Sequence, residues 1–170
     1  MSTFTGNFSN FIGNLYYYNS QSDIEKPSFF IFKMTECNKL FIGVKGSTNI
    51  NDATINMALK PIHTNKGVYI KGYYYAALYI YNYAYLFIKK HNGSIYFIGH
   101  SMGASVSTVL HCLSNFDFFN TKEINTIAFA PAPAISEDLN KTYGNKIVTI
   151  INSEDIVPTI SIPNIVNFLK

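Results

Sequence analysis

A serine held between two glycines is the first residue whose surroundings point to chemistry. Residues 99–103 read Gly-His-Ser-Met-Gly, which fits the pattern Gly-x-Ser-x-Gly around Ser101. The segment follows an apolar run typical of a strand and opens an amphipathic run typical of a helix, the context in which this pattern forms a nucleophile elbow. Such a bend raises the serine hydroxyl above the sheet edge and aims the next backbone N–H, here that of Met102, at a developing oxyanion. The spacing predicts Ser101 as a nucleophile; a glycine-flanked turn without chemistry is the alternative.

Two other segments carry groups that such a serine requires. Asp155 follows the apolar run 147–151, and an acidic residue just past a strand is well placed to orient a base. Gly46-Ser47 follows another apolar run, 40–44, where a backbone N–H and a hydroxyl could supply the second oxyanion donor. Taken singly, Asp155 also suits a loop or cap, and Gly46-Ser47 also suits a plain turn.

The alternation of apolar segments predicts the elements that would position these residues. Strands are expected at residues 29–32, 40–44, 94–98, 124–130 and 147–151. Helices are expected over 71–90, over 101–114, from 136 onward and around 8–18, while residues 50–70 are expected to be irregular. Because strands alternate with helices after residue 70, the sequence predicts one α/β domain over residues 1–170, with a mostly parallel central sheet and helices on both faces.

The composition excludes several classes of function. The chain has 170 residues, 48% of them hydrophobic, and a net charge of only +3. All thirteen cationic side chains are lysines, so no guanidinium can clamp phosphate, and the lysines form no dense stripe for nucleic acid. No run reaches the length of a membrane span, and the absence of a signal peptide makes a cytoplasmic protein the expectation. We expect no cofactor and no metal, and we expect Cys37 and Cys112 to be free thiols.

Together the motifs resemble the class 3 lipases, the fungal-type triacylglycerol lipases. The resemblance spans about residues 28–163 and rests on four blocks in order, at 40–47, 71–73, 99–104 and 152–158. The block at 99–104 is close to the family's Gly-His-Ser-Leu-Gly-Gly, and the block at 152–158 resembles its Asn-x-x-Asp-x-Val-Pro. The resemblance implies a minimal or truncated α/β-hydrolase fold. It also implies hydrolysis of acylglycerols or other carboxylic esters through an acyl-serine.

The same resemblance implies roles for individual residues. Ser101 would be the nucleophile and Asp155 the acid of a catalytic triad. Ser47 and the N–H of Met102 would form the oxyanion hole. Residues 48–57 would take the place of the family's lid, a short amphipathic segment that contacts the lipid interface. A surface loop with its apolar residues turned inward is the alternative for that segment.

Departures from the family pattern accompany these matches. Lys45 stands where the family has arginine, Ile70 stands where it has histidine before Gly-Phe, and the chain has no tryptophan for the lid. The gravest departure concerns the base. The family's catalytic histidine lies tens of residues past the aspartate, and here no histidine follows His111. Serine needs an adjacent base, and loss of one triad member costs roughly 10⁴ to 10⁶ in rate.

The histidines that are present offer one substitute. His63, in the loop region beside the expected lid, is the only one that could reach Ser101; a solvated loop histidine is the alternative. His100 is expected to turn away from Ser101 into the packing. His91 is expected to cap a helix C-terminus. His111 is expected to lie about 15 Å along the helix from Ser101, which is too far.

Two functions therefore stay open. The first is a lipase-like ester hydrolase, either with a non-standard base or read from a truncated or frameshifted sequence. The second is a non-catalytic lipase-like protein that binds lipid or a protein partner. The elbow and the aspartate block favour the first, and the tyrosine-rich run over residues 73–85 suits the second.

Overall fold

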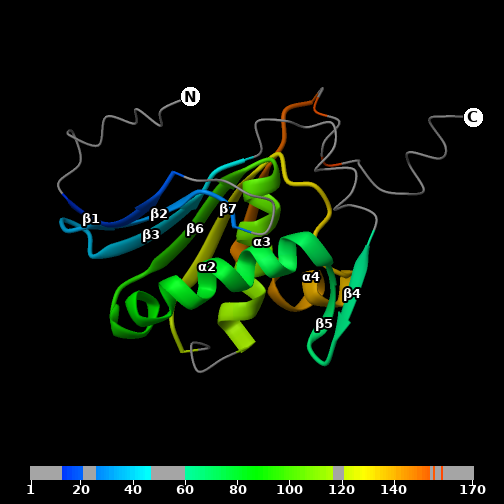
Figure 1. The fold of residues 1–170 in the computed structure, drawn as a ribbon, viewed down its shortest axis with the longest axis horizontal. Coiled ribbons are helices and arrows are strands. Elements are labelled where there is room, and N and C mark those ends of the chain that lie inside the picture. Colours follow the sequence, from blue (N-terminus) through cyan, green and yellow to red (C-terminus); the bar gives the residue numbers. More distant parts are fainter. Residues whose placement is uncertain are drawn as a thin grey trace, which may run out of the picture.

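A six-stranded mixed sheet forms the centre of the molecule (Figure 1). The computed structural model describes residues 13–20, 26–46, 60–116, 121–153, 155 and 158. The strands lie in the order β1-β2-β3-β6-β7-β8. Their bounds are Gly13–Asn19, Phe29–Met34, Lys39–Val44, Ile95–His100, Ile124–Phe129 and Ile147–Ile150. The first three strands pair antiparallel, and β3, β6, β7 and β8 pair parallel, so the carboxyl ends of these four strands share one edge.

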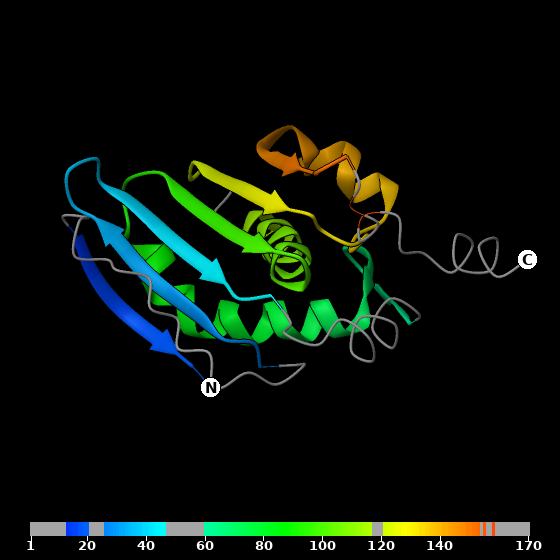
Figure 2. The same ribbon diagram turned by 90° about the horizontal axis from the view of Figure 1, so that it is seen from above.

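Helices connect the parallel strands one after another. The helices are α2 (Lys71–Lys90), α3 (Met102–Phe116) and α4 (Glu137–Tyr143), and a short turn of 3-10 helix, η2 (Gly144–Lys146), follows the last. Since the strand order advances one step at a time, crossovers of the usual hand place their helices on the same face of the sheet. Figures 1 and 2 show α3 crossing α2, and the two helices pack against each other.

The core fills the space between this helical layer and the sheet. Strand residues alternate, so Ile31, Ile42 and Phe97 point into the layer and are fully buried. On α2 the buried positions recur with helical spacing: Tyr73, Ala76, Ala77, Ile80, Tyr81, Ala84 and Ile88. The small alanines let α2 lie close to α3, and this packing fixes the frame around the strand ends.

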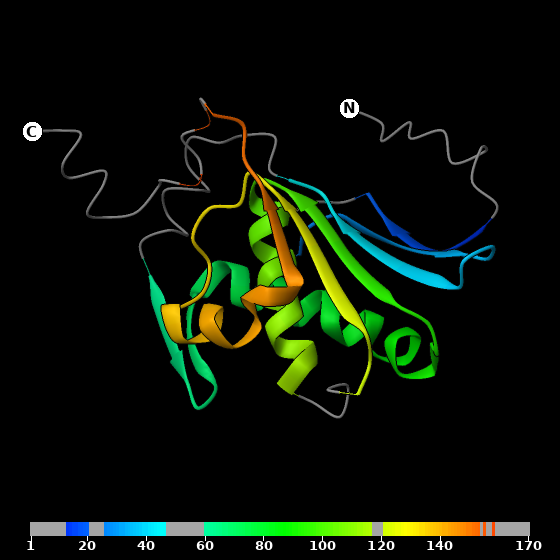
Figure 3. The same cartoon turned by 180° about the vertical axis from the view of Figure 1, so that it is seen from behind.

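The opposite face of the sheet, which we call the open face, carries no helix in the part of the chain that the structure describes. The expected second helical layer is therefore not found among those residues. Phe129, Val148 and Ile150 are large apolar side chains that remain exposed on strands β7 and β8. Figure 3 shows β8 at the end of the sheet, beside β7.

Most of the predicted elements are confirmed, and two predictions are wrong. The helix expected around 8–18 is wrong for residues 13–18, which belong to β1 and pair antiparallel with β2. The run of tyrosines there suits a pleated surface better than a helix. The segment 50–70, expected to be irregular, contains the hairpin of β4 (Pro61–Thr64) and β5 (Gly67–Ile70).

Two further expectations can be compared with the structure. Cys37 and Cys112 are free thiols, as predicted, the first exposed and the second buried. None of the described helices is long and apolar enough to cross a membrane.

Candidate active site

Ser101 occupies a tight bend between β6 and α3. Its φ is +54°, in the left-handed region that residues with side chains seldom adopt. Its N–H donates to the carbonyl of Phe129 on β7 at 2.9 Å, and its own carbonyl accepts from Ala104 at 2.9 Å and Ser105 at 3.2 Å. These bonds hold the strained residue in place. Ser101 is 6% exposed, so little of it meets bulk solvent.

The two glycines of the motif are required by close backbone contacts. A Cβ on Gly99 would lie 2.2 Å from the carbonyl oxygen of Gly103. A Cβ on Gly103 would lie 2.3 Å from the carbonyl oxygen of Val44 at the end of β3. Real Cβ atoms do not approach backbone so closely, so only glycine allows strand and helix to meet on both sides of Ser101. The glycine-flanked bend that the sequence predicts between strand and helix is therefore present in the backbone, and the role of Ser101 as a nucleophile stays a prediction.

The backbone near the elbow offers a site for negative charge. Met102 is the first residue of α3, where the N–H has no carbonyl one turn earlier in the helix. The aligned peptide dipoles of α3 add a partial positive charge at the same end. A Cβ on Gly46 would lie 2.6 Å from the carbonyl oxygen of His100, so the chain leaving β3 also lies against the elbow. Ser47, the other expected oxyanion donor, lies outside the described residues, as do residues 48–57.

Asp155 lies past the carboxyl end of β8. Its N–H donates to the carbonyl of Asn152 at 2.9 Å, and the residue is half-buried. Strands β6 and β8 are parallel and separated only by β7, so their carboxyl ends lie about 10 Å apart at the usual strand spacing. Ser101 and Asp155 thus follow strands whose carboxyl ends share one edge of the sheet, and the role of Asp155 as the triad acid stays a prediction.

His63 is not brought to Ser101 by any hydrogen bond. It is exposed on β4, in the separate two-stranded sheet, and pairs across the hairpin with Val68. The role of His63 as a substitute base stays a prediction.

The other histidines serve the framework. His111 is buried in α3 with Nδ1 3.0 Å from Thr126 Oγ1 on β7, and burial, with a smaller contribution from Lys146, lowers its pKa to about 4. His91 caps α2, as predicted, and burial lowers its pKa, so it lies there as a neutral ring at pH 7.

The expectation that His100 turns into the packing is wrong. His100 is exposed and lines a hollow on the open face, because alternation along β6 directs it away from α3.

Two contributors to the elbow have no signal in the sequence. The carbonyl of Phe129 receives the N–H of Ser101, and the next residue, Ala130, has a φ of +50°. Ala130 also donates its N–H to Ile150 at 2.8 Å, which ties the exits of β7 and β8 together. Every residue has a backbone carbonyl, so the sequence cannot show which one accepts the bond from Ser101. The acceptor becomes clear only once β7 is known to lie beside β6. In the described part of the chain, no cluster of His, Cys, Asp and Glu side chains is placed to hold a metal ion.

Comparison with solved structures gives the same architecture. A triacylglycerol lipase from Penicillium expansum superimposes with a TM-score of 0.71 at 16% identity, covering 88% of this chain and 63% of that one. A lipase from Rhizopus microsporus var. chinensis gives a TM-score of 0.76 at 10% identity, covering 91% and 58%. The Lip2 lipase of Yarrowia lipolytica gives 0.73 at 13% identity, covering 89% and 62%. The chain therefore has the lipase type of α/β-hydrolase fold and spans about three fifths of the length of these structures.

The sequence comparison identifies the family. No curated protein matches the chain at a significant level. The family model described as Lipase (class 3) matches residues 41–165, a span that includes the elbow and the aspartate block. That span covers well over half of the sequence. The chain belongs to the class 3 lipase family.

Proposed function

We propose that this chain is a serine ester hydrolase of the lipase type, acting on acylglycerols or other carboxylic esters. The observation that carries the proposal is the left-handed φ of Ser101 inside a glycine-locked elbow. Such strain persists only where the surroundings enforce it, and it is concentrated at functional sites. Family membership supports the same chemistry.

The proposed reaction assigns one task to each group. Ser101 Oγ attacks the ester carbonyl carbon while its proton passes to a base. The C–O bond to the alcohol then breaks, the alcohol leaves with that proton, and the acyl group stays on Ser101 until water removes it. The N–H of Met102 stabilises the negative oxygen of the tetrahedral intermediates, and Asp155 orients the base and stabilises it when protonated.

The base is the component that this chain does not supply at Ser101 by direct contact. All four histidines of the sequence lie in described segments, and none of them forms a hydrogen bond with Ser101. Without a base the rate would fall by roughly 10⁴ to 10⁶ relative to a complete triad. Imidazole added to the solution is small enough to act in its place.

The test measures hydrolysis of p-nitrophenyl butyrate with and without added imidazole. We expect imidazole to increase the rate above the sum of uncatalysed and imidazole-only hydrolysis for the wild type, and to give no such increase for Ser101→Ala. A fluorophosphonate probe should label Ser101, more strongly when imidazole is present. His63→Gln separates the substitute base, since it should lower the rate only if His63 takes the proton. A folded protein with no label and no Ser101-dependent turnover would overturn the proposal.

A non-catalytic role in binding lipid or a protein partner is the second candidate. It is favoured by the absence of an imidazole bonded to Ser101 and by the apolar side chains on the open face. The expected contact of residues 48–57 with a lipid interface belongs to both candidates. Ester turnover that disappears in Ser101→Ala would defeat this second candidate.

A further inference from the structure

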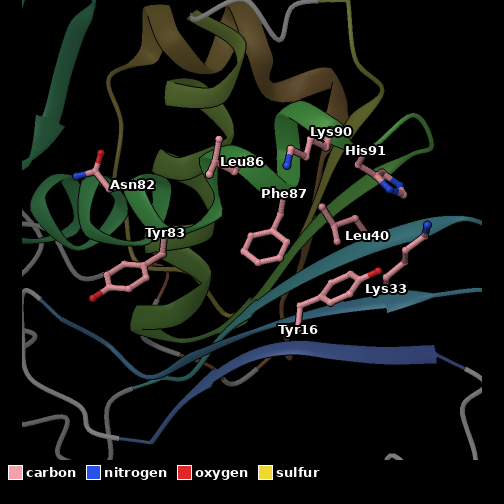
Figure 4. Close-up of a pocket in the computed structure, with 9 residues that line it drawn as sticks. All are labelled: Tyr16, Lys33, Leu40, Asn82, Tyr83, Leu86, Phe87, Lys90 and His91. Atoms are coloured by element: carbon pink, nitrogen blue, oxygen red, sulfur yellow. The ribbon is translucent and has the colours of Figure 1, made fainter.

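A groove lies between α2 and the antiparallel part of the sheet (Figure 4). Its volume is about 460 Å³. Leu40 and Phe87 lie in its interior, Tyr16 and Leu86 form its sides, and Lys33 and Lys90 stand at the end nearest His91. None of these side chains has a role in the proposed hydrolysis.

The groove is remote from the elbow. His91 ends α2, and β6 then runs from Ile95 to His100 before the chain reaches Ser101. The rise along a strand of this length separates the two ends by about 20 Å. The groove therefore lies at the amino end of the parallel strands, whereas Ser101 lies at the carboxyl end. Occupation of one does not require occupation of the other.

The apolar part of the groove is a strip along α2. Tyr83, Leu86, Phe87 and Lys90 lie on one face of the helix because their spacing is three or four residues. The strip is about 10 Å long at the helical rise. Phe87 stacks on Tyr16 with ring centroids 5.5 Å apart, while Leu86 is 58% exposed. Leu86 and Tyr83, the latter 47% exposed, thus offer apolar surface to a ligand.

The charged side chains at one end of the groove are lysines without acidic partners among the described residues. Neither Lys33 nor Lys90 forms an ion pair with any residue that the structure describes. None of the described residues that line the groove is acidic. Lys122 donates to the carbonyl of His91 nearby, and burial first, then Lys33 and Lys122, lower the pKa of His91. Cations on several sides make this end suited to an anion.

We propose that this groove binds the carboxylate of a medium-chain fatty acid, with its hydrocarbon chain along Leu86 and Phe87 and its head group beside Lys33 and Lys90. A small-molecule site is usually an apolar cleft with a few placed polar groups, and this groove has that composition. A carboxylate supplies the charge that the two ammonium groups lack. The proposal does not rest on the proposed hydrolysis.

Isothermal titration with dodecanoate, below the concentration at which it forms micelles, tests the site. The wild type should bind it, and Lys33→Gln with Lys90→Gln should weaken binding roughly five- to tenfold, as expected for two partly exposed charge pairs. Lys71→Gln is the matched control, because it removes the same charge from the far end of α2 and should leave binding unchanged. Leu86→Ser should weaken dodecanoate and dodecanol alike, whereas the lysine substitutions should affect only dodecanoate.

Other results would overturn the proposal. If Lys71→Gln weakened dodecanoate binding as much as the double lysine variant does, the loss of affinity would follow from net charge and not from a site at Lys33 and Lys90. Loss of dodecanoate binding in Ser101→Ala would place the ligand at the elbow. Affinity for anionic vesicles without any titration of the dissolved fatty acid would make this region a membrane contact in place of a groove for one molecule. Thermal unfolding of each variant establishes that it is folded.

Discussion

Ser101 adopts a backbone conformation that its side chain disfavours. A left-handed residue with a Cβ costs about 1–2 kcal/mol relative to the right-handed region. The bond from its N–H to the carbonyl of Phe129 and the bonds to its own carbonyl compensate for this cost. The fold itself therefore imposes the strained backbone at Ser101. Its cost in folding stability can be measured without knowing the substrate.

Replacing Ser101 with glycine should relieve that strain. We expect Ser101→Gly to have a free energy of unfolding about 1 kcal/mol higher than Ser101→Ala, because alanine keeps the Cβ and glycine removes it. Urea denaturation of the two variants measures the difference. Equal stabilities would contradict a left-handed backbone at this position.

Gly99 is expected to tolerate no side chain. A Cβ there would meet the backbone of Gly103 and Ala104, which cannot move without displacing the start of α3. We expect Gly99→Ala to lower the free energy of unfolding by about 3 kcal/mol or more. Gly144→Ala is the matched control, since its added Cβ meets only the exposed side chain of Asn140. A similar small loss in both variants would refute the glycine requirement of the elbow.

At the scale of elements, α3 is joined to β7 by a buried polar contact. His111 Nδ1 lies 3.0 Å from Thr126 Oγ1, and both residues are almost fully buried. Burial keeps this imidazole neutral, because it lowers the pKa of His111 from the usual histidine value of about 6.5 to about 4. The helix that begins directly after Ser101 is thus attached to the neighbouring strand through a group that acid can charge.

Acid should therefore weaken the fold. Between pH 6.5 and about 4, His111 is protonated in the unfolded chain but not in the folded chain. The free energy of unfolding therefore has its full value above pH 6.5 and decreases as the pH falls toward 4. The full loss is about 3 kcal/mol. Urea denaturation at pH 7.5, 5.5 and 4.5 measures it. His111→Asn should flatten the dependence in part, because His91 is shifted in the same direction.

The elements predicted from sequence are those whose pattern is local. The helix over Lys71–Lys90 is found with the predicted bounds, since two lysines, a histidine and a glycine end its apolar periodicity. For the residues of β1 the sequence predicts a helix, because their pairing with β2 cannot be seen in the run itself. The elbow can be predicted from the sequence because its two glycines are needed to avoid clashes with neighbouring backbone atoms. The carbonyl of Phe129 and the φ of Ala130 were not, since they depend on which strand lies beside β6.

At the scale of the whole molecule, the sheet is unevenly covered. The described helices occupy one face, and apolar side chains continue across the open face from strand to strand, since Ile98 pairs with Ile127 and Ile127 with Val148. The last strand, β8, pairs only with β7, so its outer edge has unpaired backbone groups in the described structure. An apolar face beside a free strand edge favours association between chains.

A charge on the open face of β8 should reduce that association. Val148 is 58% exposed and Ile150 is 46% exposed. Both lie on the open face, because Val148 pairs with Ile127 and Ile150 pairs with Phe129, whose side chains are on that face. We expect Val148→Lys to lower the apparent mass at high protein concentration in light scattering, because pairing would bury the ammonium group. Thr149→Lys adds the same charge to the other face of the strand and should change the mass less. Since Val148 is mostly exposed, neither variant should shift the melting temperature by more than about 2 °C. Equal masses for the wild type and Val148→Lys across the concentration range would show that the open face does not bring chains together.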